Sequence, residues 1–232
     1  MTTEILQEGI VSLTKSRDVF RSYVKKSHER LTDFPNSSYY FHKKVIDMIR
    51  TSDYDELLSN DLFFEFVYAT LSSWGLDRMD GGARLEEFIV FRKCVLDSSD
   101  FLRNLCKARL NKLDDKEREE TKSKLAVLFD KLGGVMKTES KLVGVSKTMH
   151  HLLPDLVPPI DRKHTETFFY GRPVNRAQEK KAFLELFDCF HLICKKLNLS
   201  ERDLEEKWDT SIPKLIDNAI IGYVKEKLQD KG

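Results

Sequence analysis

The stretch Glu179–Leu197, EKKAFLELFDCFHLICKKL, decides the fold of this chain. Its apolar residues recur every three to four positions, so they lie on one face of a helix. That face carries Phe183, Leu186, Phe187, Phe190, Cys194 and Leu197. A long face rich in phenylalanine is typical of a helix at the centre of a core. We therefore predict a central core helix over residues 179–197.

The same helical period recurs outward from this stretch along most of the chain. Between Asp61 and Trp74 it places six residues on one face, at 63, 66, 67, 70, 71 and 74. Further helices are predicted over 3–30, from 37 or 38 to 50, and as two or three segments within 84–131 broken near 97–100 and 111–114. Thr210 or Ser211 is expected to cap a last helix, with Pro213 in its first turn.

The predicted fold class is therefore all-α, a multi-helix globular bundle that forms a single domain over residues 1–232. No alternating β pattern runs for more than four residues. Two glycine-containing interruptions, at 74–85 and 132–144, divide the helices into blocks. These interruptions are compatible with two lobes, 1–131 and 132–232, and with a cleft between them.

Composition excludes several classes of protein. The 232 residues carry a net charge of only +1, so no global charge points to nucleic acid or to a membrane. The first twenty residues lack the pattern of a signal peptide, and no apolar stretch approaches the roughly 20 residues of a membrane span. Cys94, Cys106, Cys189 and Cys194 form no CxxC pair. We expect reduced thiols, a cytoplasmic location, no cofactor and no metal site.

Special residues gather in the stretch Val143–Gly171, VGVSKTMHHLLPDLVPPIDRKHTETFFYG. Gly144 and Ser146 are predicted to mark a turn into a helix that begins near Val145 or Ser146. Lys147 would then lie in the first turn, against the positive end of the helix dipole. That position and burial both favour the neutral amine, which is a nucleophile able to form Schiff bases. An exposed surface lysine is the simpler alternative.

The second half of this stretch turns the chain. Pro154, Pro158 and Pro159 favour extended backbone. Asp161 can then cap a helix that runs from Arg162 to about residue 169 or 170, and this cap is a sufficient structural role for its carboxylate.

Two further features bear on ligands. His150 and His151 are adjacent, so they point about 100° apart on a helix and cannot easily share one metal ion. Charge is also concentrated locally, because residues 136–181 hold nine Lys or Arg against five Asp or Glu, a net +4. A positive patch around a glycine turn at a helix N-terminus suits a phosphate group.

The run LVGVSKTMHHLL…VPPID resembles the core of the helix-hairpin-helix DNA glycosylases, the oxidised-guanine group in particular. The resemblance covers about residues 142–169 and implies a helix-hairpin-helix element near 137–153. Ser146 stands where the family has its second hairpin glycine. The chain resembles more closely the uncharacterised bacterial proteins that pair a WG…R segment with an SK.LHHLLPDLVPPID segment.

The resemblance implies a nucleic-acid-associated function. Lys147 would attack the sugar C1′ of a flipped nucleotide, and Asp161 would stabilise the positive charge on the sugar. The DNA contacts it implies come from Gly144, Ser146, Arg78, Arg84, His151 and Arg162. The alternative is a non-catalytic helical interaction module in which the prolines only orient helices and the arginines near Gly81 and Gly82 lie in solvent.

Overall fold

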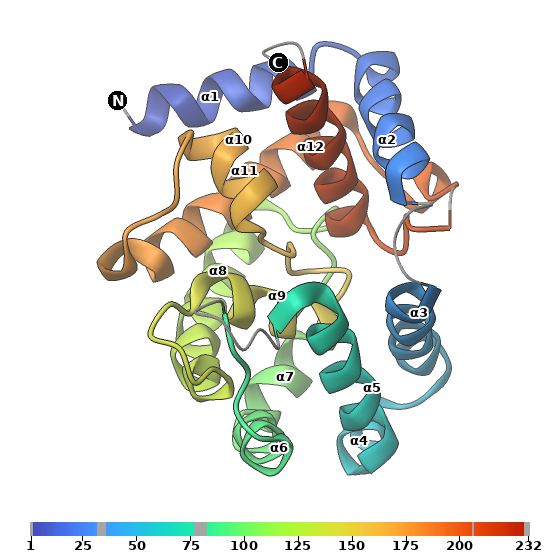
Figure 1. The fold of residues 1–232 in the computed structure, drawn as a ribbon, viewed down its shortest axis with the longest axis vertical. Helices are drawn as coiled ribbons and strands as arrows, with labels where there is room; N and C mark the ends of the chain where they lie inside the picture. Colours follow the sequence, from blue (N-terminus) through green and yellow to red (C-terminus); the bar gives the residue numbers. More distant parts are fainter. Residues whose placement is uncertain (1, 32–35, 77–82, 206, 230–232) are drawn as a thin grey trace.

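The structure, a computed structural model, describes residues 2–31, 36–76, 83–205 and 207–229. These residues form twelve α-helices, which confirms the all-α prediction (Figure 1). The helices are α1 (Thr2–Leu13), α2 (Arg17–Leu31), α3 (Asn36–Thr51), α4 (Tyr54–Ser59), α5 (Asp61–Leu71), α6 (Phe88–Leu96), α7 (Ser99–Leu105), α8 (Asp115–Lys131), α9 (Leu142–Leu152), α10 (Thr167–Tyr170), α11 (Glu179–Leu197) and α12 (Ile212–Gln229). Short helical turns join them: η1 (Ser72–Leu76), η2 (Leu132–Val135), η3 (Arg162–Glu166), η4 (Arg176–Gln178) and η5 (Glu201–Asp203).

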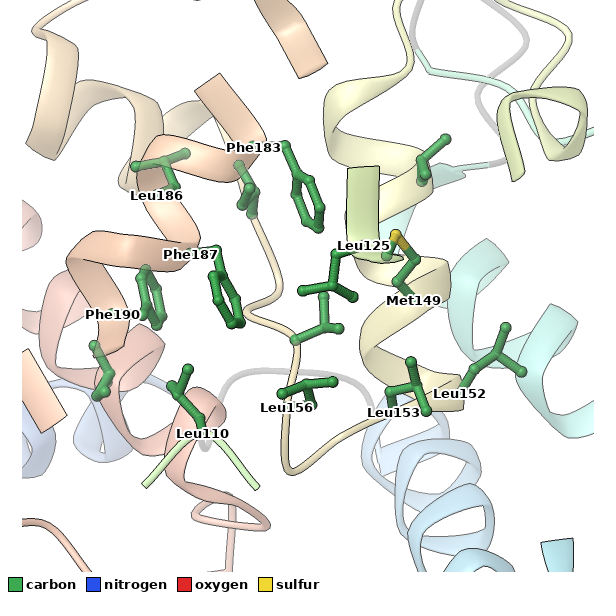
Figure 2. Packing of buried hydrophobic residues seen from close by; sticks show 14 of the residues in the cluster. Leu110, Leu125, Met149, Leu152, Leu153, Leu156, Phe183, Leu186, Phe187 and Phe190 are labelled. Carbon is green, nitrogen blue, oxygen red and sulfur yellow. The ribbon is translucent and has the colours of Figure 1, made fainter. Parts of the chain in front are cut away.

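Helix α11 has the predicted bounds and lies in the core. Phe183, Phe187 and Phe190 are fully buried. Figure 2 shows the rings of Phe183 and Phe187 on the side of α11 that faces Leu125 of α8 and Met149 of α9. Burying a phenylalanine side chain contributes about 1.5–3 kcal/mol, so this face accounts for much of the packing that fixes α8 and α9.

The two ends of the chain pack on each other. Helix α2 runs beside α12, and α1 lies against α10 and α11 (Figure 1). The approach of α2 to α12 is close at Gly222, where an added Cβ would lie 1.9 Å from the carbonyl oxygen of Tyr23. One hydrophobic cluster extends from Ile10 to Val224. The division into lobes 1–131 and 132–232 stays a prediction.

Local signals set several helix ends. The helix predicted over 3–30 is in fact two helices, because Ser16 interrupts it and its hydroxyl accepts the backbone N–H of Val19 at the start of α2. Ser211 caps α12, as predicted, by accepting the N–H of Lys214.

Within the described ranges, no helix is both long enough and apolar enough to cross a membrane.

Candidate functional site

A cavity of about 730 Å³ opens between α9, η1, η3 and α12. Six side chains supply its chemistry: Trp74, Lys147, Asp161, Trp208, Lys214 and Asp217. Arg162, Lys163 and Lys225 also line it. We call this cavity, with these residues, the α9–α12 pocket. It contains Lys147 and Asp161, the two residues that the sequence analysis proposed as catalytic.

Lys147 lies in the second turn of α9 and not in the first, because the helix begins at Leu142. Its ammonium Nζ is 3.2 Å from Asp161 Oδ2 and 5.8 Å from the centre of the Trp74 indole ring. Only 7% of the residue is exposed. Lys147 is therefore a buried, ion-paired side chain at the pocket wall and not a surface lysine.

Asp161 caps η3, as predicted, and uses its second oxygen for Lys147. Its Oδ1 accepts the backbone N–H of Lys163 at 2.8 Å and of His164 at 3.2 Å, and it lies 3.1 Å from His164 Nδ1. Burial by itself raises the pKa of Asp161, but the hydrogen bond from His164 and the charge of Lys147 outweigh burial and hold this pKa far below its usual range. The carboxylate is therefore ionised at neutral pH.

The N-terminus of α9 is occupied by an internal carboxylate. Oε2 of Glu179 accepts the backbone N–H groups of Lys141 at 2.6 Å and Leu142 at 3.1 Å, and Oε1 accepts the hydroxyl of Ser140 at 2.6 Å. This buried carboxylate takes the place at the positive end of the helix that a DNA phosphate was expected to take.

The prediction of a turn at Gly144 and Ser146 is wrong, because both residues lie inside α9. An added Cβ at Gly144 would meet Met136 Sδ at 2.2 Å, so this glycine serves close packing. The Ser146 hydroxyl is buried, donates to the Val143 carbonyl and accepts the N–H of Ile160. Residues 137–153 contain one helix, so the two-helix hairpin expected there is not observed.

His151 is fully buried behind the pocket and is not among its lining residues. Its Nδ1 bonds to the Lys147 carbonyl at 2.8 Å, and its Nε2 lies 3.1 Å from Nδ1 of His42. Burial lowers the pKa of His151 to about 4. The ring packs edge-on against Trp74 at 4.7 Å. His151 thus supports the indole from behind, where it cannot reach DNA.

The three arginines predicted to contact DNA differ in their position relative to the pocket. Arg162 is exposed, lines the pocket and donates to the Ser140 hydroxyl at 3.2 Å. Arg84 is exposed just outside the pocket, beside Ala83, which lines it. Arg78 lies outside the described residues.

Sequence reasoning missed the contribution of α12. Nζ of Lys214 donates to Asp217 Oδ2 at 2.6 Å and lies 5.5 Å from the Trp74 ring centre. Each of these two charged residues is only 4% exposed. Every residue from 211 to 222 is buried. The available signal was therefore a Lys and an Asp three positions apart on a helix whose neighbouring residues are largely apolar.

The pocket carries an excess of positive charge. Its lining includes five cations, namely Lys147, Arg162, Lys163, Lys214 and Lys225, against the two acids Asp161 and Asp217, a net +3. A concave surface with this charge and low-dielectric walls attracts anions. The chain as a whole carries only +1, so the charge is concentrated at this site.

Comparison of the chain with protein-family models, with curated proteins and with solved structures finds no match.

Proposed function

We propose that this protein binds nucleic acid, receives an extruded nucleotide in the α9–α12 pocket and excises its base in the manner of a DNA glycosylase. The observation that carries the proposal is the ion pair of Lys147 and Asp161, at 3.2 Å, in the wall of a cationic pocket that also contains two tryptophans. An amine and an ionised carboxylate at one site are the groups that base excision with Schiff-base formation requires.

The volume of the pocket and the aromatic and cationic side chains that line it suit a flipped nucleotide. Its volume of about 730 Å³ lies within the range of roughly 300–1,000 Å³ that is usual for small-ligand sites. Trp74 and Trp208 offer aromatic surfaces, and stacking of a base on an aromatic side chain contributes about 1–3 kcal/mol. Arg162, Lys163 and Lys225 are the candidates for phosphate contacts, because the N-terminus of α9 already holds Glu179.

The proposed reaction balances with the residues present. The Lys147 ammonium gives one proton to the departing base as the bond between the base and C1′ breaks. The resulting neutral amine captures C1′, and a second proton moves from nitrogen to O4′ as the sugar ring opens. The product is a protonated Schiff base between Lys147 and C1′. Asp161, which stays ionised, stabilises the positive charge on the sugar and does not act as a base.

Borohydride trapping tests this proposal directly. Duplexes that each contain one damaged base are incubated with the protein and borohydride, which reduces the Schiff base to a stable amine. We expect a covalent adduct that peptide mapping assigns to Lys147. The Lys147→Gln variant should give none. The matched control Lys180→Gln, which removes a half-exposed lysine paired with Asp130 away from the pocket, should trap normally.

A non-catalytic helical module is the second candidate, and one observation favours it. Both oxygens of Asp161 are already engaged, because Oδ1 caps η3 and Oδ2 joins η3 to Lys147 of α9. The pair would then serve only to hold two helical segments together. Absence of any adduct with the wild-type protein, across a broad panel of damaged bases, would favour this module over the glycosylase.

A further inference from the structure

The charged groups on the wall of the α9–α12 pocket are sorted by burial. Two lysines of the lining are buried, and each is paired with a carboxylate. Nζ of Lys147 lies 3.2 Å from Oδ2 of Asp161. Nζ of Lys214 lies 2.6 Å from Oδ2 of Asp217. Because each pair has no net charge, the buried part of the wall is electrically balanced and suits an uncharged ring.

Two other cations of the lining differ from these lysines. Arg162 and Lys163 are exposed, so they lie at the mouth of the pocket, where its wall meets solvent. Within the described ranges, no ion pair joins either side chain to a carboxylate. The backbone N–H of Lys163 is already accepted by Asp161 Oδ1, so it is the two side chains that remain for a ligand. The mouth therefore presents two adjacent positive charges to whatever enters the pocket.

The guanidinium of Arg162 is held at the pocket wall. Its Nη2 donates to the hydroxyl of Ser140 at 3.2 Å, and Ser140 also lines the pocket. The Ser140 hydroxyl donates in turn to Oε1 of the buried Glu179 at 2.6 Å. A guanidinium has five N–H donors, and the described residues take one of them, through Ser140. The side chain is thus oriented by the protein and keeps most of its donors for a ligand.

A phosphomonoester matches these two cations better than a phosphodiester or a carboxylate does. It carries a charge of about −1.5 to −2 at pH 7 and three acceptor oxygens. A guanidinium can bind two of these oxygens with parallel N–H groups, and an ammonium can bind the third. A phosphodiester or a carboxylate carries a single negative charge, so it would leave one of the two cations without a counterpart.

We infer that Arg162 and Lys163 form a subsite for a terminal phosphate, so that the pocket binds a nucleoside monophosphate with its base inside and its phosphate at the mouth. This inference rests on the proposed function for the nucleoside part. A free mononucleotide and the phosphorylated end of a strand both carry this phosphomonoester. An internal nucleotide of DNA offers only phosphodiesters, so it binds this subsite more weakly.

Small ligands test the inference without duplex DNA. The only two tryptophans of the chain, Trp74 and Trp208, both line the pocket, so quenching of tryptophan fluorescence reports its occupancy. The probes are 2′-deoxyguanosine, its 5′- and 3′-monophosphates, and the methyl ester of each monophosphate. Each ester keeps the position of the phosphate but is a phosphodiester with one negative charge. A dinucleotide with and without a terminal phosphate represents the end of a strand.

We expect the better of the two monophosphates to bind at least about tenfold more tightly than the nucleoside, which is the usual effect of a hydrogen bond to a charged group, and to lose most of this gain on methylation. The double variant Arg162→Gln/Lys163→Gln should bring the ratio close to one. The matched control Arg176→Gln/Lys180→Gln also removes two exposed cations, both outside the pocket lining, and should keep the ratio. The two double variants have the same net charge, so the comparison separates the subsite from the overall field of the protein. The same preference in the phosphorylated dinucleotide would extend the site from free nucleotides to strand ends.

Equal binding of the nucleoside and both monophosphates, equal binding of each monophosphate and its methyl ester, or no quenching by any probe would overturn the inference. The comparison among ligands uses the unaltered protein, so it decides the question even if a variant does not fold. Failure of the inference is distinguishable from failure of the proposed function. Trapping on DNA without a preference for monophosphates refutes the subsite alone, whereas that preference without trapping refutes the excision reaction alone.

Discussion

The carboxylate of Glu179, the first residue of α11, accepts the backbone N–H of Leu142, the first residue of α9, from 37 positions further along the chain. Helix α9 has no local side-chain cap. The central core helix of the fold thus provides the charge that stabilises the start of the helix that carries Lys147.

Glu179→Gln should lower the free energy of unfolding by about 1–2 kcal/mol, because a neutral amide interacts more weakly with the positive end of α9 and cannot accept from all three donors. Urea unfolding followed by circular dichroism measures this change. Glu139→Gln, which removes an exposed carboxylate paired with Arg176, is the control and should change the value by less than about 0.5 kcal/mol. Equal effects of the two variants would contradict the role of Glu179.

Gly222→Ala should be strongly destabilising, because the new methyl group would meet the Tyr23 carbonyl oxygen at 1.9 Å and force α2 away from α12. Overpacking of this kind costs about 1–3 kcal/mol, and backbone against backbone belongs at the upper end. Thermal unfolding provides the measurement. Gly133→Ala, where an added Cβ meets nothing within 4 Å, is the matched control. An unchanged melting temperature for Gly222→Ala would contradict the observed approach of the two helices.

Acid should destabilise the fold in two separate pH windows. Burial lowers the pKa values of His42, His150 and His151 below the ordinary value near 6.5. Since the folded state disfavours the protonated rings, their contribution to stability is complete above pH 6.5 and is lost as pH falls below that value, for His151 down to about pH 4. Each histidine contributes a slope of up to about 1.4 kcal/mol per pH unit. Asp161, whose folded pKa is depressed, begins to lose its contribution only below about pH 4.

His151→Gln tests this assignment through the slope and not through the absolute stability. The variant removes one of the three buried imidazoles. The slope of the unfolding free energy against pH between 6.5 and 4 should therefore fall by up to about 1.4 kcal/mol per pH unit, which corresponds to one proton. The slope below pH 4 should be unchanged. A wild-type slope near zero between pH 6.5 and 4 would be incompatible with neutral buried histidines.

DNA binding, which the proposed function requires, should weaken as salt rises, with a slope of log affinity against log salt of about −0.9 for each phosphate contacted. Arg162→Gln and Lys163→Gln, at the pocket, should each reduce that slope by about one. Arg84→Gln decides whether the exposed arginine beside Ala83 also belongs to the interface. Fluorescence anisotropy on a labelled duplex measures all three, with Lys180→Gln as the control. Affinity that does not change with salt would argue against phosphate contacts.

The predictable part of the structure is the part that local periodicity determines. Residues 179–197 form one helix over the predicted range, and Asp161 caps η3 as its sequence position indicated. The start of α9 was misplaced because its stabilising group, Glu179, comes from a distant segment that no local pattern connects to Leu142.

The site was only half predictable for the same physical reason. Lys147 and Asp161 are 14 positions apart, so one turn of the chain brings them together. The contact between His42 and His151 spans 109 positions, and Lys214 reaches the pocket only through the packing of α12. Nothing in the sequence near residue 147 indicates these partners, because tertiary packing alone creates the contacts.

The docking of α2 on α12 also has a consequence for the order in which the protein is made. Residues 17–31 leave the ribosome long before residues 212–229, yet the two helices bury each other. The apolar face of α2 must therefore remain without its native partner while the intervening residues are translated. Since α12 also brings Lys214 and Asp217, the event that covers this face is the one that completes the pocket. The pocket of a nascent chain thus stays incomplete until α12 has been synthesised.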